Sequence, residues 1–179
     1  KKECNPDYYL LLNNDTVVQK DFLTKLVETA ERHTNAGIVC GKIYYYSNPT
    51  KVWFAGGTFN SKLAVADHIN YNMIDNIKNM YEKEIEFATG CLLLLPKKTI
   101  DIVGLLDETF FLYAEDTDYS RRVRNENMKI VYRNDAIIYH KVSIASRNGD
   151  NISYYMIRNN LYIVKNYASN KFPAYLNAS

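Results

Sequence analysis

Residues 111–122 read Phe-Leu-Tyr-Ala-Glu-Asp-Thr-Asp-Tyr-Ser-Arg-Arg, and this stretch is the most informative one for the fold. Three carboxylates fall within four positions, where an apolar run gives way to a helical, Arg-rich one. Acidic side chains in a first helical turn are stabilised by its free N–H groups and by the helix dipole, which keep them ionised at neutral pH. The stretch therefore predicts a helix from about Glu115 to Glu126 with carboxylates at its start.

This acidic turn has two interpretations. Capping preferences alone favour the structural one, in which the carboxylates simply stabilise a helix N-terminus. An ionised carboxylate at the lip of a sheet can also take a proton from a hydroxyl, as a general base does. A second acidic turn, Asn13-Asn14-Asp15, and a histidine at a strand end, His140, favour the chemical interpretation.

Strands and helices alternate along the chain, which predicts an α/β fold. The sheet should be mixed, because several late strands are too closely connected for helical crossovers. The first apolar run, Asp7 to Leu12, is typical of a central strand covered on both faces. Further strands are expected at 38–46, 86–95, 129–132 and 136–140, a short strand or hairpin at 53–59, and helices at 22–30, 97–103, 115–126 and 151–168.

Composition narrows the class of protein. The 179 residues suit one domain, 1–179, or a large part of a bigger one. A net charge of +2 gives no argument for nucleic acid or for an anionic membrane surface. The three widely spaced cysteines favour buried thiols of a reducing, cytoplasmic compartment over a disulfide or zinc framework. No apolar run is long enough to span a bilayer. The polar, Asn-rich stretch 61–84 is expected to be an insertion or a flexible excursion.

The turn after the first strand offers oxygen ligands. Asp15 supplies a hard carboxylate oxygen and Asn13 an amide oxygen at the carboxyl edge of the predicted sheet, where α/β proteins place ligands. A divalent cation held by one or two carboxylates plus phosphate oxygens is the usual magnesium arrangement. An Asx-turn that caps the next segment is the alternative interpretation.

Two further residues fit the same chemistry. His140 ends an apolar strand and could complete a metal site begun by Asp15, which would move the preference from magnesium toward manganese. Arg158, in the predicted last helix, could aim its planar guanidinium at a phosphate. The alternatives are a structural histidine and a solvated arginine beside an aromatic core stripe.

Together these features resemble glycosyltransferase family 2, particularly its rhamnosyltransferase-like bacterial branch. The resemblance runs from about Tyr8 to Tyr167 and rests on four motifs in the family's order. These are Leu-Leu-Leu-Asn-Asn-Asp-Thr-Val-Val at 10–18 (the family's variant of the DxD motif), Gly-Leu-Leu-Asp-Glu-Thr-Phe-Phe-Leu-Tyr-Ala-Glu-Asp-Thr-Asp-Tyr-Ser-Arg-Arg at 104–122, His140, and Tyr-Tyr-Met-Ile-Arg-Asn-Asn-Leu at 154–161.

The resemblance implies a GT-A fold and the metal-dependent, inverting transfer of a hexose or rhamnose. The sugar would move from a nucleotide-diphosphate donor to a hydroxyl of a glycan or lipid-linked acceptor, in polysaccharide biosynthesis for a bacterial cell envelope. The implied location is the cytoplasm, with peripheral association at the inner face of the membrane. The implied site residues are Asp116 as base with Glu115 beside it, Asp15 and His140 on Mg or Mn, Asn13, Asn14, Gly90 and Arg158 on the donor side, and Trp53, Gly57 and Asp118 on the acceptor side.

The sequence departs from the family pattern at its start. Family members begin with a βαβ half that binds the nucleotide base, and the strand at Asp7 corresponds to their fourth strand. We therefore expect an N-terminally truncated GT-A sheet, an exposed edge beside Tyr8 to Leu12, and weak donor binding by this chain alone. A non-catalytic carbohydrate- or nucleotide-sugar-binding module is the alternative function. A glycoside hydrolase is less favoured, because adjacent Glu115 and Asp116 do not flank a scissile bond at about 5 to 9 Å.

Overall fold

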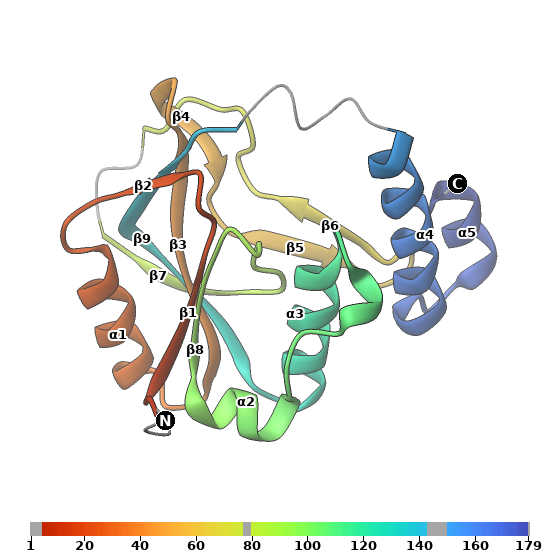
Figure 1. Cartoon of the computed structure of the whole chain (residues 1–179), viewed down its shortest axis with the longest axis horizontal. Helices are drawn as coiled ribbons and strands as arrows, with labels where there is room; N and C mark the ends of the chain where they lie inside the picture. The colour runs from red at the N-terminus through yellow and green to blue at the C-terminus, as the bar shows by residue number, and fades with distance from the viewer. Residues whose placement is uncertain (1–4, 77–79, 143–149, 179) are drawn as a thin grey trace.

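The computed structural model describes residues 5–76, 80–142 and 150–178, and Figure 1 shows a sheet with helices on both sides. The strands are β1 (Tyr8–Leu12), β2 (Thr16–Val18), β3 (Ala36–Tyr45), β4 (Asn48–Phe54), β5 (Gly57–Asn60), β6 (Val65–His68), β7 (Glu82–Ile85), β8 (Leu92–Pro96) and β9 (Lys129–His140). The helices are α1 (Phe22–Arg32), α2 (Lys97–Val103), α3 (Glu115–Asn125), α4 (Asp150–Tyr167) and α5 (Lys171–Ala178), with a 3-10 turn at Glu108–Phe110.

The main sheet is mixed, as predicted. Its strands follow the order β1-β8-β3-β9-β2, while β4 also pairs with β3 and β7 also pairs with β9. Only β3 and β9 run parallel among these pairs, and the others are antiparallel. A separate two-stranded sheet is formed by β5 and β6.

The predicted pair of strands at 129–132 and 136–140 is one continuous strand, β9. The residues between them, Arg133 to Asp135, belong to an irregularity where the β3–β9 register shifts between Gly41 and Lys42. A Cβ at Gly41 would lie 2.1 Å from the Ala136 carbonyl oxygen. The absence of a side chain at Gly41 is therefore what lets the two strands pass this bulge.

Other boundaries also differ from the prediction. The expected strand 86–95 is wrong: β7 ends at Ile85, β8 starts at Leu92, and a connection that carries Gly90 lies between them. The expected strand or hairpin at 53–59 is divided between two sheets, because Gly56 adopts a φ of 100° between β4 and β5. Helix α5 was not predicted.

The first strand is not central. Among the described residues β1 pairs only with β8, so it is an edge strand of the sheet, and Tyr9, Leu10 and Leu12 are 36–37% exposed. A run of apolar residues shows that a strand can be covered, but it does not specify what covers it. The exposed edge expected beside Tyr8 to Leu12 is present.

The segment 61–84 contains β6 and most of β7. Asp75 within it accepts hydrogen bonds from buried Lys42 and from Tyr44, both at 2.5 Å, and so ties the segment to β3. Residues 77–79 lie outside the described part of the chain. That the segment is an insertion stays a prediction.

Two apolar clusters hold the layers together. The larger one joins the sheet to α1 and α3, and all four leucines of β8 are at most 1% exposed. The smaller one packs α4 and α5 against the β5–β6 hairpin and the 3-10 turn, and its members are Phe59, Ala64, Phe110, Ile163, Val164, Ala168 and Ala174. Figure 1 shows α4 and α5 as an outer layer beyond α3. No helix among the described residues has the length and apolar character needed to cross a membrane.

Candidate active site

Asp15 and His140, the metal pair predicted from the sequence, lie close together at the edge of the sheet. Strand β2 pairs with β9 so that Thr16 lies opposite His140. Thr16 also donates a hydrogen bond to the Asn13 carbonyl at 2.7 Å, which fixes the acidic turn. The Asp15 Oδ2 and His140 Nε2 atoms are consequently 3.1 Å apart. The predicted approach of these side chains is confirmed, whereas their binding of a metal stays a prediction.

His140 is suited to be a neutral ligand. Its side chain is 10% exposed, and burial lowers the pKa of the imidazole, partly offset by the neighbouring Asp15. Its Nδ1 is buried without a hydrogen-bond partner, and the Trp53 ring meets it edge-on with centroids 4.6 Å apart. Within the described residues no third His, Cys, Asp or Glu joins the pair to form a metal cluster. Any further ligands would be other oxygen donors, such as the Asn13 amide, water or a substrate.

The acidic turn at the start of α3 is strained. Tyr113 and Ala114 both adopt a φ of 67°, a region that residues with side chains rarely occupy. Ala114 is the N-cap and offers no side-chain cap, so the simple capping interpretation lacks its hydrogen bond. Strain of this type persists where the surrounding structure imposes it, commonly at functional sites.

The carboxylate of Asp116 points at the connection before β8. Its Oδ2 accepts a hydrogen bond from the Gly90 amide at 2.9 Å, and its Oδ1 accepts one from the Thr117 amide at 2.7 Å. Burial nevertheless raises the pKa of Asp116, because these hydrogen bonds and the charge of His68 offset it only in part. A carboxylate with a raised pKa is a stronger base at neutral pH than an ordinary one.

Glu115 precedes Asp116 in the first turn of α3. Burial, and then the charge of Asp116, raises the pKa of Glu115. Its Oε2 is buried without a hydrogen-bond partner. A Cβ placed at Gly90 would lie 3.5 Å from both Glu115 Oε1 and Asp116 Cβ, so a side chain there would contact both carboxylate-bearing residues.

The two acidic turns converge through one connection. Gly90 donates to Asp116, and the next residue, Cys91, accepts a hydrogen bond from the Asn13 amide at 3.1 Å. Burial raises the pKa of Cys91 to about 12, and the charges of Asp15 and Asp116 both contribute. The sequence thus brings the predicted metal turn and the predicted base to opposite sides of two consecutive residues.

A buried amide in α4, which the sequence reasoning missed, holds the strained loop. Asn159 is fully buried and donates to the carbonyls of Leu112 and Tyr113, both at 2.7 Å. Its neighbour Arg158 donates to the Thr109 carbonyl and stacks near the Tyr155 ring, 4.9 Å from its centroid. The Arg-Asn-Asn run was visible in the sequence, but nothing in it showed which amide is buried. The predicted phosphate role of Arg158 stays a prediction.

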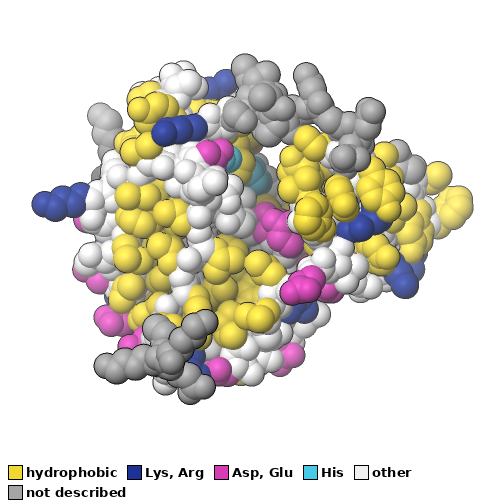
Figure 2. All heavy atoms as spheres, in the orientation of Figure 1, with side chains coloured by type: hydrophobic (Ala, Val, Ile, Leu, Met, Phe, Trp, Pro, Cys, Tyr) yellow, Lys and Arg dark blue, Asp and Glu magenta, His cyan; other side chains and the backbone are white. Residues whose placement is uncertain are grey.

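An aromatic cavity of about 470 Å³ adjoins the metal pair. Its lining includes Trp53, Tyr71, Tyr113, His140 and a residue that the sequence analysis missed, His68. The Nδ1 of His68 lies 2.9 Å from the Trp53 carbonyl and must donate to it, since a carbonyl can only accept. Figure 2 shows acidic and histidine side chains gathered in a hollow between the sheet and α4.

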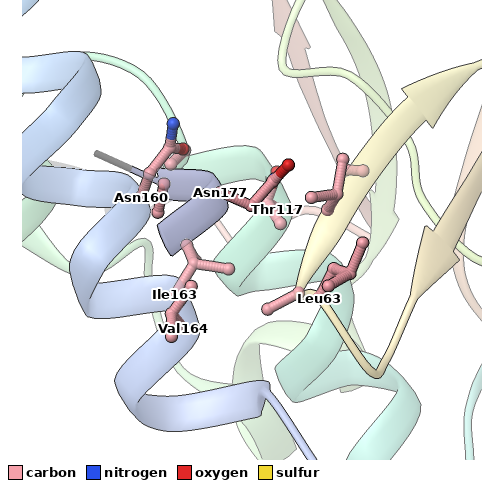
Figure 3. Close-up of a pocket in the computed structure, with 11 residues that line it drawn as sticks. Leu63, Thr117, Asn160, Ile163, Val164 and Asn177 are labelled. Atoms are coloured by element: carbon pink, nitrogen blue, oxygen red, sulfur yellow. The ribbon is translucent and has the colours of Figure 1, made fainter. Parts of the chain in front are cut away.

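A second cavity of about 220 Å³ lies on the other side of the α3 start. Figure 3 shows Ile163 and Asn160 of α4 across it from Leu63 of the β5–β6 turn, with Thr117 and Asn177 at its border. Ala66 lines both cavities, while the strained pair Tyr113 and Ala114 contributes one residue to each. The two cavities therefore adjoin along the acidic turn.

Two residues predicted on the acceptor side have other surroundings. Asp118 is 3% exposed, and its two oxygens accept from Arg122 at 2.7 Å and from the Tyr167 hydroxyl at 2.6 Å. Gly57 is buried, and a Cβ on it would lie 2.5 Å from the Phe87 ring. The structure thus places both in packing contacts, and their contact with an acceptor stays a prediction.

Comparisons with known proteins identify relatives of this chain. The model of the family described as "Glycosyl transferase family group 2" matches residues 8–151. The low-salt glycan biosynthesis hexosyltransferase Agl10 of Haloferax volcanii is 26% identical over 136 residues, which cover 72% of this chain and 40% of that protein. A crystal structure of GalNAc-T7 with UDP, GalNAc and Mn2+ has a TM-score of 0.63 at 10% identity, and the match covers 89% of this chain and 31% of that one. The chain spans less than half the length of either relative.

Proposed function

The chain belongs to glycosyl transferase family group 2, and from this premise we propose that it transfers a sugar from a nucleotide-diphosphate donor to an acceptor hydroxyl with inversion and with the help of a divalent cation. The similarity to GalNAc-T7 shows a GT-A-like fold. The observation that carries the proposal is that two consecutive residues contact both acidic turns: the Gly90 amide donates to Asp116, and the Cys91 carbonyl accepts from the Asn13 amide in the turn that contains Asp15.

Asp15 and His140 would hold the cation. A carboxylate oxygen and an imidazole nitrogen 3.1 Å apart form half of a site that a donor's diphosphate oxygens can complete. The donor set of one oxygen and one nitrogen suits Mn²⁺ at least as well as Mg²⁺. When bound, the cation would neutralise charge on the departing diphosphate. Asn13 and Asn14 lie in the same turn and would contact the donor beside it.

Asp116 would be the base. The acceptor oxygen forms a bond to the anomeric carbon, the bond from that carbon to the diphosphate oxygen breaks with its electron pair leaving on the diphosphate, and the hydroxyl proton goes to Asp116. A single displacement of this kind inverts the anomeric centre. Glu115 would lie beside the base, with its own pKa raised by burial and then by the charge of Asp116.

The aromatic cavity would receive the acceptor. Sugar rings bind well against aromatic side chains that expose a face with polar groups nearby, and Trp53, Tyr113 and His68 provide this combination. The adjoining second cavity, bordered by Asn160 and Asn177, would take the next unit of a glycan.

The buried thiols of Cys40 and Cys91 suit a reducing cytoplasmic location.

Transfer can be tested with UDP-hexoses and dTDP-rhamnose as donors and a panel of oligosaccharide and polyprenyl-linked acceptors. We expect product only with Mn²⁺ or Mg²⁺ and none after addition of a chelator. Asp15→Asn should raise the Mn²⁺ concentration for half-maximal rate by about tenfold or more, as loss of one charged ligand implies. Asp21→Asn, which removes an exposed carboxylate that pairs only with Lys25 in α1, is the matched control. Donor binding without transfer or hydrolysis would instead indicate a non-catalytic sugar-binding module.

A further inference from the structure

Helices α4 and α5 expose large apolar side chains on the side that faces away from the domain. In α4, Tyr154, Ile157, Leu161 and Tyr162 follow helical spacing along one stripe. In α5, Phe172 is 77% exposed and Leu176 69% exposed. We call this surface the outer face, and its members are Tyr154, Ile157, Leu161, Tyr162, Phe172, Tyr175 and Leu176.

Although the Tyr162 ring meets that of buried Phe110, with centroids 6.2 Å apart, most of the outer face is not needed to pack the helices. Their opposite sides already carry the apolar residues Ile163, Val164 and Ala174, which are at most 2% exposed and join the smaller core cluster. Isolated exposed apolar residues are normal, but a continuous patch of this size on a domain indicates an interaction surface. Figure 2 shows hydrophobic and basic side chains together over α4 and α5.

The charge of this region is mostly positive, and the acidic residue of α4 is its first, Asp150. From Asn151 to Ser179 the sequence contains three cations, Arg158, Lys165 and Lys171, and no Asp or Glu. Arg158 lies over the rings of Tyr154 and Tyr162, with its carbon 5.8 and 5.9 Å from their centroids. A groove of about 290 Å³, lined by Arg158, Leu161, Tyr162, Lys165 and Tyr175, joins the two helices and makes the outer face continuous.

We propose that the outer face docks on the surface of an anionic phospholipid bilayer. Amphipathic helices with aromatic and aliphatic residues beside lysine and arginine lie in the membrane interface, with apolar side chains among the acyl chains and cations at the phosphates. A second copy of this chain fits less well, because two outer faces would bring the cations Arg158, Lys165 and Lys171 of both copies together. The positive charge is local, which explains how a chain of net charge +2 can carry it.

Docking would also orient the active site. The helix that carries the outer face is the one whose Asn159 and Arg158 hold the loop before the acidic turn. If the proposed transferase function is correct, a lipid-linked acceptor would approach from the same surface. Binding to vesicles does not itself depend on that function, so the two proposals can fail separately.

The test is co-sedimentation of the folded chain with vesicles of phosphatidylcholine and with vesicles that also contain phosphatidylglycerol. We expect binding to the anionic vesicles only, weakened by salt. The double variants Lys165→Glu/Lys171→Glu and Phe172→Ser/Leu176→Ser should each reduce vesicle affinity by about tenfold or more. Lys20→Glu/Lys62→Glu and Ile102→Ser change exposed residues elsewhere and should bind as the wild type does.

Circular dichroism would confirm that each variant is folded. Three results would overturn the proposal: equal binding to both kinds of vesicle, anionic binding that the outer-face variants leave unchanged, or no binding at all. Light scattering on the free protein provides a further check. A dimer that Phe172→Ser/Leu176→Ser converts to a monomer would mean that a second copy covers the outer face instead.

Discussion

The α1 side of the sheet and the region around Glu115 and His140 both contain buried titratable groups, and the two regions differ in how those groups are paired. On the α1 side, the Arg133 side chain is 8% exposed, with Glu28 at 3.0 Å and Asp135 at 2.7 Å. In the region around Glu115 and His140, the Glu115 Oε2 and the His140 Nδ1 are buried without partners.

This difference separates a region that stabilises the fold from one that carries chemistry. Paired charges with several hydrogen bonds are tolerated inside a protein, whereas an unpaired buried group lowers the free energy of unfolding. The region around Glu115 and His140 contains unpaired buried atoms together with positive φ angles at Tyr113 and Ala114. Burial also raises the pKa values of the carboxyl groups of Glu115 and Asp116. Perturbed titratable groups in a cavity are a marker of an active site.

The largest expected effect is on catalysis. Asp116→Asn should lower kcat by about 10²- to 10⁴-fold, because general-base catalysis contributes a factor of that size. The KM for the donor should change little, since the base contacts only the acceptor. Steady-state kinetics with a nucleotide sugar would measure both values.

Asp118→Asn is the matched control, two residues further along the same helix. Because Asp118 binds Arg122 and Tyr167, its loss should lower the free energy of unfolding rather than kcat. If Asp118→Asn abolished turnover in a folded protein while Asp116→Asn kept it, the base would have been assigned to the wrong carboxylate.

The next effect is on the α1 side of the sheet. Arg133→Met should lower the free energy of unfolding by about 2 kcal/mol, because it leaves acidic groups and a carbonyl of α1 without their donor. Because Glu28 and Asp135 are partly exposed to solvent, we expect the loss of unfolding free energy to be no larger than this. Urea denaturation would measure it, and kcat at a temperature where the variant is folded should equal that of the wild type. A large loss of kcat would show that the two regions are coupled.

Asn159→Ala should slow transfer by about tenfold, or about 1.4 kcal/mol, because the strained loop before Glu115 loses its donors. The KM for the donor should stay close to the wild-type value. Asn166→Ala, at an exposed position of the same helix, should have no effect on either constant. A normal kcat for Asn159→Ala would mean that the loop holds its conformation without this amide.

The smallest effect concerns Glu115. In the folded protein its pKa is raised, so at acid pH both folded and unfolded forms are neutral, and at neutral pH folding buries an unpaired charge. Glu115→Gln should therefore raise the Tm at pH 7 by about 2 to 4 °C, and the gain should disappear as the pH falls below the ordinary range of a glutamate. A scan of Tm against pH measures this. A Tm that falls at pH 7 would show that the charge has a partner in solution.

Local patterns predicted the elements whose signals are local. Helix α2 has the predicted bounds, because Gly104 marks its end. Helix α3 begins at the predicted residue, because the sequence changes there from apolar to charged residues. The meeting of Asp15 and His140 was also accessible, because both end apolar strands. The merging of the predicted strands 129–132 and 136–140 into β9 could not be predicted, because it depends on Gly41 in β3, which is distant in the sequence.

The same limit explains the missed site residues. His68 stands in a polar, weakly periodic stretch, and only the tertiary fold brings it to Trp53. Asn159 stands in an ordinary helical sequence, and only the tertiary fold brings it to the carbonyls of the loop before Glu115. Asp118 and Gly57 illustrate the opposite case, and their role on the acceptor side stays a prediction. Each stands beside a motif in the sequence, yet the structure buries each in contacts with other side chains.

We propose that the acidic turn at Asp15 and the strand end at His140 form a metal site near Asp116. The most direct measurement is an anomalous difference map from crystals grown with Mn²⁺ and a nucleoside diphosphate. We predict one peak within about 2.0 to 2.6 Å of both Asp15 Oδ2 and His140 Nε2, with phosphate oxygens as its other ligands. A Mn²⁺ peak on other residues while the nucleotide is bound, or a bound nucleotide with no peak between these two side chains, would contradict the account.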